Sequence, residues 1–122
     1  MTRIAVCEDN EMERTVLMEL IFAWAKKRNV EIDLEGFADG EELLEDFKKS
    51  RYDLLFLDIL MEQVNGIEAG KAIREMDAKT EIVYCTSCST FALEAYEVHA
   101  RDYLLKPYDP VKIGETLDKY TK

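Results

Sequence analysis

The sequence has 122 residues, of which 48% are hydrophobic and 34% are charged, and its formal net charge at pH 7 is −10. This length fits one domain with a single sizeable core, and no apolar run approaches the ~20 residues that a membrane-spanning helix needs. The acidic balance argues against direct nucleic-acid binding, because phosphate contacts need a cationic face, and favours a protein partner or a metal ion.

Three cysteines are present: Cys7, Cys85 and Cys88. An odd number without a framework spacing argues against disulfides and for a reducing compartment. The first apolar run begins at Arg3, which leaves no room for a signal peptide, so a cytoplasmic location is expected. Cys85 and Cys88 have Cys-x-x-Cys spacing, for which a redox or metal role is the alternative; use as small apolar side chains is favoured.

The first third of the chain predicts a strand, a helix and a second strand. Residues 3–7 form a short apolar run. Asn10, with Glu13 three residues later, has the form of a capping box, so a helix is predicted from there to about residue 28. Loose alternation over residues 30–37 predicts a half-exposed edge strand. The inward stripe of the helix is predicted as Met12, Val16, Leu20 and Ala23.

The middle of the chain contains the most apolar strand. Asp39 is predicted to cap a second helix, whose inward residues would be Leu43, Leu44 and Phe47. Residues 53–57 are a nearly continuous apolar run, which is typical of a strand buried on both faces of a parallel sheet. Asp58 follows it directly, and Gly66 opens a third helical pattern with inward residues Ile67, Gly70, Ile73 and Met76.

The last third repeats the alternation of strand and helix. Residues 81–85 and 102–105 are predicted strands, with a short helix over Ser89–Tyr96 between them. Asp109 followed by Pro110 predicts the start of a last helix, with inward residues Val111, Ile113, Leu117 and Tyr120. Five strands that alternate with five helices predict a parallel sheet with helices on both faces.

In such a sheet the carboxyl ends of the strands meet at one edge, where chemistry is usually found. The residues that follow the buried strands are Glu8, Asp9, Asp58, Thr86, Ser87 and Lys106. Each alone has an ordinary interpretation as a turn, cap or surface residue. Together they predict a functional site.

Converging carboxylates repel one another unless a cation binds, and oxygen ligands suit Mg²⁺. A magnesium ion beside Lys106 would stabilise a phosphoryl group in transfer. Asp58 is then the candidate nucleophile, because a carboxylate can form an aspartyl phosphate. Thr86 and Lys106 are candidates for contacts with the phosphoryl oxygens.

Over essentially its whole length the sequence resembles the receiver domain of two-component response regulators. The resemblance rests on Glu8-Asp9, Asp58, Gly66, Thr86 and Lys106-Pro107. It implies a flavodoxin-like (βα)5 doubly wound α/β fold, with a five-stranded parallel sheet in the order 2-1-3-4-5, as one domain over residues 1–122. It also implies a phosphoacceptor regulatory domain, rather than an enzyme with a substrate of its own, whose partner is a sensor histidine kinase.

The resemblance assigns roles to single residues. Asp58 is expected to be the phosphoacceptor. Asp9, Asp58 and the main-chain carbonyl of Leu60 are the expected Mg²⁺ ligands, with Glu8 reaching the metal through water. Thr86 and Lys106 are expected to contact the phosphoryl group, and Thr86 and Tyr103 to form the switch. Two structural roles complete the set: Gly66, and Pro107 after a cis peptide bond.

Residues 96–108 are similar to receivers that precede LytTR-type DNA-binding domains (LytR/AgrA-like), so the expected output is transcription through such a domain outside this chain. Dimerisation on phosphorylation stays open. Leu60 and Cys88 occupy positions where the family often has polar residues that place water, which suggests slow hydrolysis of the phosphorylated form.

Three alternatives remain. A haloacid-dehalogenase-like phosphatase would need a second aspartate where Leu60 stands. A flavodoxin-like carrier of FMN would place phosphate against Glu8 and Asp9, which would repel it. A phosphorylation-independent adaptor with the receiver fold would be expected to have lost the acidic pair, the acceptor or the lysine, and all of these are present.

Overall fold

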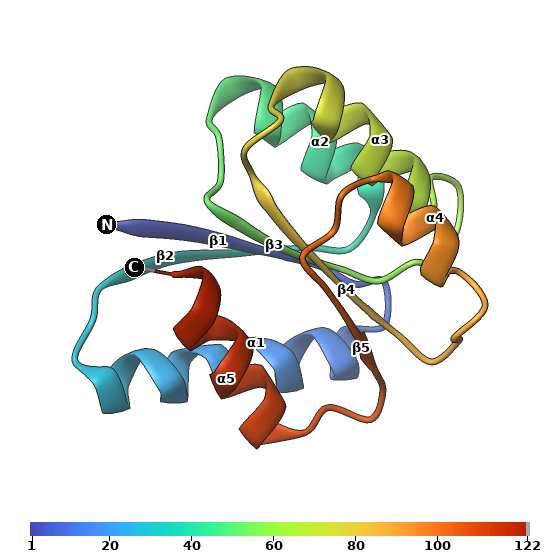
Figure 1. Cartoon of the computed structure of the whole chain (residues 1–122). Coiled ribbons are helices and arrows are strands. Elements are labelled where there is room, and N and C mark those ends of the chain that lie inside the picture. Colours follow the sequence, from blue (N-terminus) through green and yellow to red (C-terminus); the bar gives the residue numbers. More distant parts are fainter. Residues whose placement is uncertain (122) are drawn as a thin grey trace.

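Five parallel strands form a sheet between two layers of helices (Figure 1) in the computed structural model, which describes residues 1–121. The strands are β1 (Thr2–Cys7), β2 (Ile32–Phe37), β3 (Leu54–Leu57), β4 (Glu81–Thr86) and β5 (Asp102–Leu105). The helices are α1 (Glu11–Arg28), α2 (Gly40–Lys49), α3 (Gly66–Met76), α4 (Ala92–Glu97) and α5 (Pro110–Tyr120). Within the described residues, no helix has both the length and the apolar character to span a bilayer.

The strand order is β2-β1-β3-β4-β5, and every neighbouring pair is parallel. This confirms the predicted flavodoxin-like topology and the edge position of the second strand. One row of the sheet pairs Val6 with Phe56, Phe56 with Val83, and Val83 with Asp102. Because all strands run the same way, their carboxyl ends lie together at one edge.

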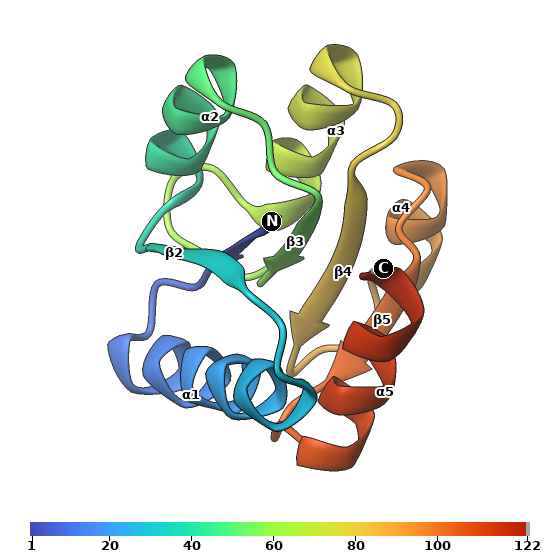
Figure 2. The same ribbon diagram turned by 90° about the vertical axis from the view of Figure 1, so that its left-hand side faces the viewer.

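The sheet separates two hydrophobic cores, because successive side chains of a strand point to opposite faces. Helices α1 and α5 cover one face, and α2, α3 and α4 cover the other (Figures 1 and 2). The first core contains Ile4, Val6, Leu17, Ile21, Leu54, Phe56, Val83, Cys85, Ile113 and Leu117. The second includes Ala5, Cys7, Leu43, Phe47, Leu55, Leu57, Ile67, Ile73, Ile82, Tyr84, Ala95 and Val98.

The buried face of α1 differs from the prediction. Met12 and Val16 are 77% and 41% exposed, whereas Leu17, Ile21 and Ala25 are buried. Apolar residues occur on several sides of this helix, so the sequence contains two apolar stripes that are offset by about one residue. The helix packs on the sheet with the stripe of Leu17, Ile21 and Ala25, and not with the predicted stripe. Val111 of α5 was likewise predicted to face inward and is exposed.

The helix starts were mostly, but not wholly, predicted. Asn10, Asp39 and Asp109 each accept a hydrogen bond from a backbone N–H in the first turn of the helix that they precede. Helix α4 begins at Ala92, three residues later than predicted, and the residue before it makes no side-chain cap.

The complete capping box lies at the start of α3 and not of α1. Asn65 Oδ1 accepts from Glu68 N at 2.9 Å, and Glu68 Oε1 accepts from Asn65 N at 3.2 Å. At α1 the side chain of Asn10 accepts from Glu13 N, but the carboxylate of Glu13 contacts Lys106 instead.

Candidate functional site

The residues that follow β1, β3 and β5 are fixed by backbone hydrogen bonds that extend the sheet. The N–H of Glu8 donates to the carbonyl of the last residue of β2 at 3.0 Å, and that of Asp58 to the last residue of β1 at 3.0 Å. The N–H of Lys106 donates to the last residue of β4 at 2.9 Å. Their positions are therefore set by the pairing of strands.

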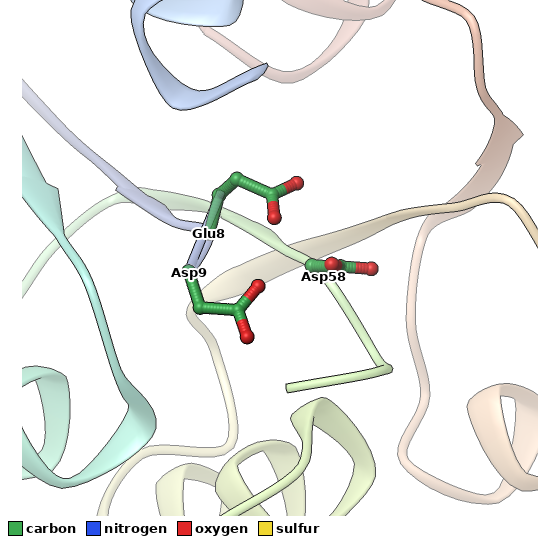
Figure 3. Close-up of side chains that lie close together, drawn as sticks. All are labelled: Glu8, Asp9 and Asp58. Carbon is green, nitrogen blue, oxygen red and sulfur yellow. The ribbon is translucent and has the colours of Figure 1, made fainter. Parts of the chain in front are cut away.

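Three carboxylates gather at this edge (Figure 3). Glu8, Asp9 and Asp58 each offer an oxygen atom, and these atoms lie within 4.8 Å of one another. Glu8 and Asp58 are buried, at 1% and 6% exposure, whereas Asp9 is exposed and leaves the cluster accessible from solvent. Hard oxygen donors with one open side fit Mg²⁺, which keeps part of its hydration shell when it binds to proteins.

The ammonium group of Lys106 reaches into this cluster. Its Nζ lies 2.5 Å from Glu8 Oε1 and 3.3 Å from Asp58 Oδ2, and it also contacts Glu13 Oε1. Burial would lower the pKa of Lys106, but its hydrogen bonds to Glu13 and Glu8, together with the negative charges of Asp58 and Glu8, raise the pKa above its ordinary value. Lys106 is therefore a permanent cation at this edge of the sheet.

Glu8 has an unusual protonation equilibrium. Burial raises its pKa to about 7, although the hydrogen bond from Lys106 acts in the opposite direction. The causes are visible in the structure, since Glu8 is almost completely buried and has a second carboxylate, Asp58, nearby. One cation beside several carboxylates leaves negative charge uncompensated, which a bound metal ion would offset.

Thr86 and Tyr103 are joined through one residue, Cys88. Thr86 is fully buried, and its Oγ1 accepts a hydrogen bond from Cys88 N at 3.3 Å. The Tyr103 hydroxyl donates to the carbonyl of Cys88, while its partly buried ring packs against the core beneath α2, α3 and α4. The hydroxyl at the end of β4 is thus linked to an aromatic ring on β5.

The peptide bond between Lys106 and Pro107 is cis.

Gly66 packs directly on the backbone that carries Asp58. A Cβ atom at Gly66 would lie 2.1 Å from the carbonyl oxygen of Asp58, so no side chain fits there. Gly66 N donates to the carbonyl of Ile59 at 2.9 Å, and the carbonyl of Gly66 accepts from the Tyr84 hydroxyl at 2.8 Å. Leu60, in the same loop, has a half-exposed side chain.

Two residues of the site were not predicted. Glu13 was interpreted only as part of a cap, although it lies in the first turn of α1, close in sequence to the residues that follow β1. Tyr108, two residues after Lys106, donates its hydroxyl to Glu8 Oε1 at 3.4 Å. Among the residues predicted to follow strands, Ser87 is exposed and makes no described contact with the cluster.

The Cys-x-x-Cys pair contains free thiols. Cys85 is buried in the core beneath α1 and α5, and burial raises the pKa of its thiol. Cys88 is partly exposed, and its sulfur lies 2.9 Å from Thr90 Oγ1. Cys85 is therefore packed as an apolar side chain, as the sequence predicted.

Comparisons with known proteins agree with this geometry. The family model described as response regulator receiver domain matches residues 4–118. Sensory transduction protein LytT of Bacillus cereus is 37% identical over the whole chain, which covers 48% of that protein. Chemotaxis protein CheY of Thermotoga maritima is 30% identical, with 98% of both chains covered. The chain thus spans about half the length of LytT, and the expected likeness to LytTR-type regulators is confirmed.

Solved structures show the same fold. The response regulatory domain of protein mrkE from Klebsiella pneumoniae has a TM-score of 0.88 at 29% identity, with 98% of this chain and 95% of that chain covered. Response regulator protein TrrA from Thermotoga maritima, in complex with Mg(2+)-BeF, has a TM-score of 0.86 at 27% identity, with 98% and 99% covered.

Proposed function

Because the chain belongs to the response regulator receiver domain family, we propose that it takes a phosphoryl group onto Asp58 from a sensor histidine kinase and so controls an output. One observation carries the proposal: the carboxylate of Asp58 lies at the end of β3, within the acidic cluster and 3.3 Å from the ammonium of Lys106. A nucleophile, a metal site and a fixed cation are the parts that phosphoryl transfer needs.

In the proposed reaction an oxygen of Asp58 attacks the phosphorus of a phosphohistidine. The bond from phosphorus to the imidazole nitrogen breaks as the new P–O bond forms, and the electron pair leaves with the imidazole. Lys106 neutralises charge on the phosphoryl oxygens, an effect strengthened by its burial beside Asp58. The backbone hydrogen bonds of Asp58 and Lys106 hold both groups in place before the donor arrives.

The residues present fit a magnesium ion. Asp9, Asp58 and the main-chain carbonyl of Leu60 would hold it, with Glu8 reaching it through water. When bound, the ion would neutralise the acidic cluster and the phosphoryl oxygens. The open side of the cluster at Asp9 supports this assignment, because the ion can enter with water still attached.

The proposed switch runs through Cys88. Thr86 would give up its hydrogen bond from Cys88 N and turn to donate to a phosphoryl oxygen. Tyr103, whose hydroxyl donates to the carbonyl of the same residue, would then repack as that segment moves. The unphosphorylated protein would already sample both arrangements of Thr86 and Tyr103, and the phosphoryl group would shift the equilibrium toward one of them.

The proposed output is transcription in the cytoplasm, through a LytTR-type DNA-binding domain that would follow residue 122 in a longer protein. The similarity to LytT, a protein about twice as long, supports this proposal. The readout surface would lie within residues 89–120, where Leu93, Tyr96 and Leu105 are exposed apolar side chains. Dimerisation on phosphorylation would use the same surface.

The test is phosphorylation by acetyl phosphate with Mg²⁺, followed by intact mass, with Asp58→Asn as the matched variant. We expect a single phosphoryl increment that needs Mg²⁺ and is absent in the variant. A folded wild-type protein that gains no increment would favour a phosphorylation-independent adaptor. An increment that persists in Asp58→Asn would place the acceptor elsewhere, with Asp9 the next candidate.

A further inference from the structure

Lys106 has three carboxylate partners from three different parts of the fold. Glu8 follows β1, Asp58 follows β3, and Glu13 lies in the first turn of α1. Glu8 and Asp58 belong to the buried acidic cluster, whereas the side chain of Glu13 is 42% exposed and stands outside it. Glu13 is therefore an additional partner that draws the lysine toward α1.

The three contacts of the Lys106 ammonium group differ in length. Both glutamates lie closer to Nζ than Asp58 does, since the distances are 2.5 Å to Glu8 and 3.3 Å to Asp58, with Glu13 in direct contact. A single ammonium group placed among three carboxylates interacts most strongly with the nearest ones. The contact of Lys106 with Asp58 is thus the longest of the three.

The carboxylate of Glu13 can contact Lys106 because it is not used in a capping box at the start of α1. The main chain of Glu13 is fixed by the hydrogen bond from its N–H to Asn10 Oδ1 at 2.9 Å. A capping box would send the side chain back to the N–H of Asn10, but that N–H already donates to Glu8 Oε2 at 3.1 Å. The side chain of Glu13 turns to Lys106 instead.

We propose that Glu13 is a positioning residue that holds Lys106 on the α1 side of the site. In that position the lysine leaves Asp58 open to a metal ion, and it must leave Glu13 to contact an incoming phosphoryl group. The inference rests on the proposed function, since it concerns the same acceptor and the same lysine.

Glu13→Gln then has opposite effects on two measurements. Without the charge of Glu13, Lys106 moves toward Asp58 and Glu8 and competes with Mg²⁺ for their oxygens, so the Kd for Mg²⁺ rises about two- to fivefold. At saturating Mg²⁺ the lysine has one ion pair fewer to break and the donor meets one negative charge fewer, so phosphorylation accelerates about three- to tenfold.

The experiment compares the wild type, Glu13→Gln and Glu11→Gln. Glu11 is an exposed acid in the same turn of α1, so its variant has the same net charge without losing a partner of Lys106. Calorimetry gives the Kd for Mg²⁺. Intact mass gives the rate with acetyl phosphate, in which the Asp58 oxygen bonds to phosphorus as the P–O bond to acetate breaks and its electron pair leaves with acetate.

We expect weaker Mg²⁺ binding and faster phosphorylation in Glu13→Gln, with Glu11→Gln close to the wild type. A fall in both properties would indicate a merely structural role and overturn the inference. Equal effects in the two variants, or none, would overturn it too. Failure of the proposed function itself is distinguishable, because the wild type would then gain no phosphoryl group at Asp58.

Discussion

At the scale of single residues, the buried carboxyl group of Glu8 makes stability depend on pH. Its pKa of about 7 exceeds the ordinary 4.5, so the folded state binds the proton more tightly than the unfolded state does. For an acid of this kind, the stability of the metal-free protein falls as pH rises from about 4.5 to 7. Glu8→Gln removes this dependence on pH, which amounts to about 3 kcal/mol over the whole interval.

Urea denaturation in a chelating buffer measures this effect of Glu8 on the pH dependence of stability. The free energy of unfolding of Glu8→Gln, minus that of the wild type, should increase across the interval from pH 4.5 to 7. The same difference for Glu11→Gln should stay nearly flat, because Glu11 is exposed in the first turn of α1. A flat difference for Glu8→Gln would mean that Glu8 titrates as an ordinary carboxyl group.

Two other residues bear on the lifetime of the proposed phosphoaspartate. Leu60 is half exposed in the loop after Asp58, and Cys88 offers a thiol already paired with Thr90. Neither side chain orients water well. Leu60→Gln combined with Cys88→Asn should therefore accelerate loss of the phosphoryl group several-fold, measured as decay of the phosphorylated mass after the donor is removed. An unaltered lifetime would contradict the idea.

Residues of the site differ in how far the sequence predicts them. Glu8, Asp58 and Lys106 directly follow strands, so their places depend only on strand pairing, which apolar runs reveal. Glu13 and Tyr108 lie further from the strand ends. Their contacts depend on the rotation of α1 and on the path of the chain after β5, and neither leaves a periodic pattern in the sequence.

At the scale of elements, α3 and β4 meet at a point where only glycine fits. A Cβ at Gly70 would lie 2.1 Å from the Tyr84 hydroxyl and 2.9 Å from Val98 Cγ1. Gly70→Ala should lower the free energy of unfolding by about 1–3 kcal/mol, because overpacking outweighs the better helix propensity of alanine.

A double-mutant cycle tests whether the clash between a Cβ at Gly70 and the Tyr84 hydroxyl is the cause of the destabilisation. Tyr84→Phe alone loses the hydrogen bond to the carbonyl of Gly66 and should cost about 1 kcal/mol. In the Gly70→Ala background it also removes the atom that clashes, so the double variant should be more stable than the sum of the single changes predicts. Strict additivity in thermal or urea unfolding would show that α3 shifts away from β4 instead.

The helices also show where sequence patterns become ambiguous. In α2 and α3 the polar and apolar faces are distinct, and the inward residues Leu43, Phe47, Ile67 and Ile73 were predicted. In α1 both Val16 and Leu17 are apolar, and the choice between their stripes is made by the sheet and by α5. Periodicity therefore identifies such a helix without identifying its buried side.

At the scale of the whole molecule, metal binding should be visible as stability. The net charge is −10, and three of the carboxylates converge at one edge. A ligand that binds only the folded state stabilises it by about 1.4 kcal/mol at ten times its Kd. Mg²⁺ should thus raise the unfolding temperature more than NaCl of equal ionic strength does, and removal by a chelator should reverse the gain.

Asp9→Asn is the matched variant for this measurement, because Asp9 is exposed and belongs to the acidic cluster. Its response to Mg²⁺ should shrink to that of NaCl. Equal responses to the two salts in the wild type would indicate general screening of charge and no specific metal site.

The three backbone bonds that extend the sheet to Glu8, Asp58 and Lys106 also bear on how this scaffold tolerates redesign. Since those groups follow directly from paired strands, we expect that the parts of the surface loops without a proposed site residue, such as residues 61–64 and 89–91, can be lengthened or exchanged without moving the groups relative to one another. An insertion of one residue inside β1, β3 or β5 would instead turn the following side chain to the opposite face. Libraries of variants that aim to change the phosphoryl donor or the partner protein should therefore vary residues in the loops and not in the strands.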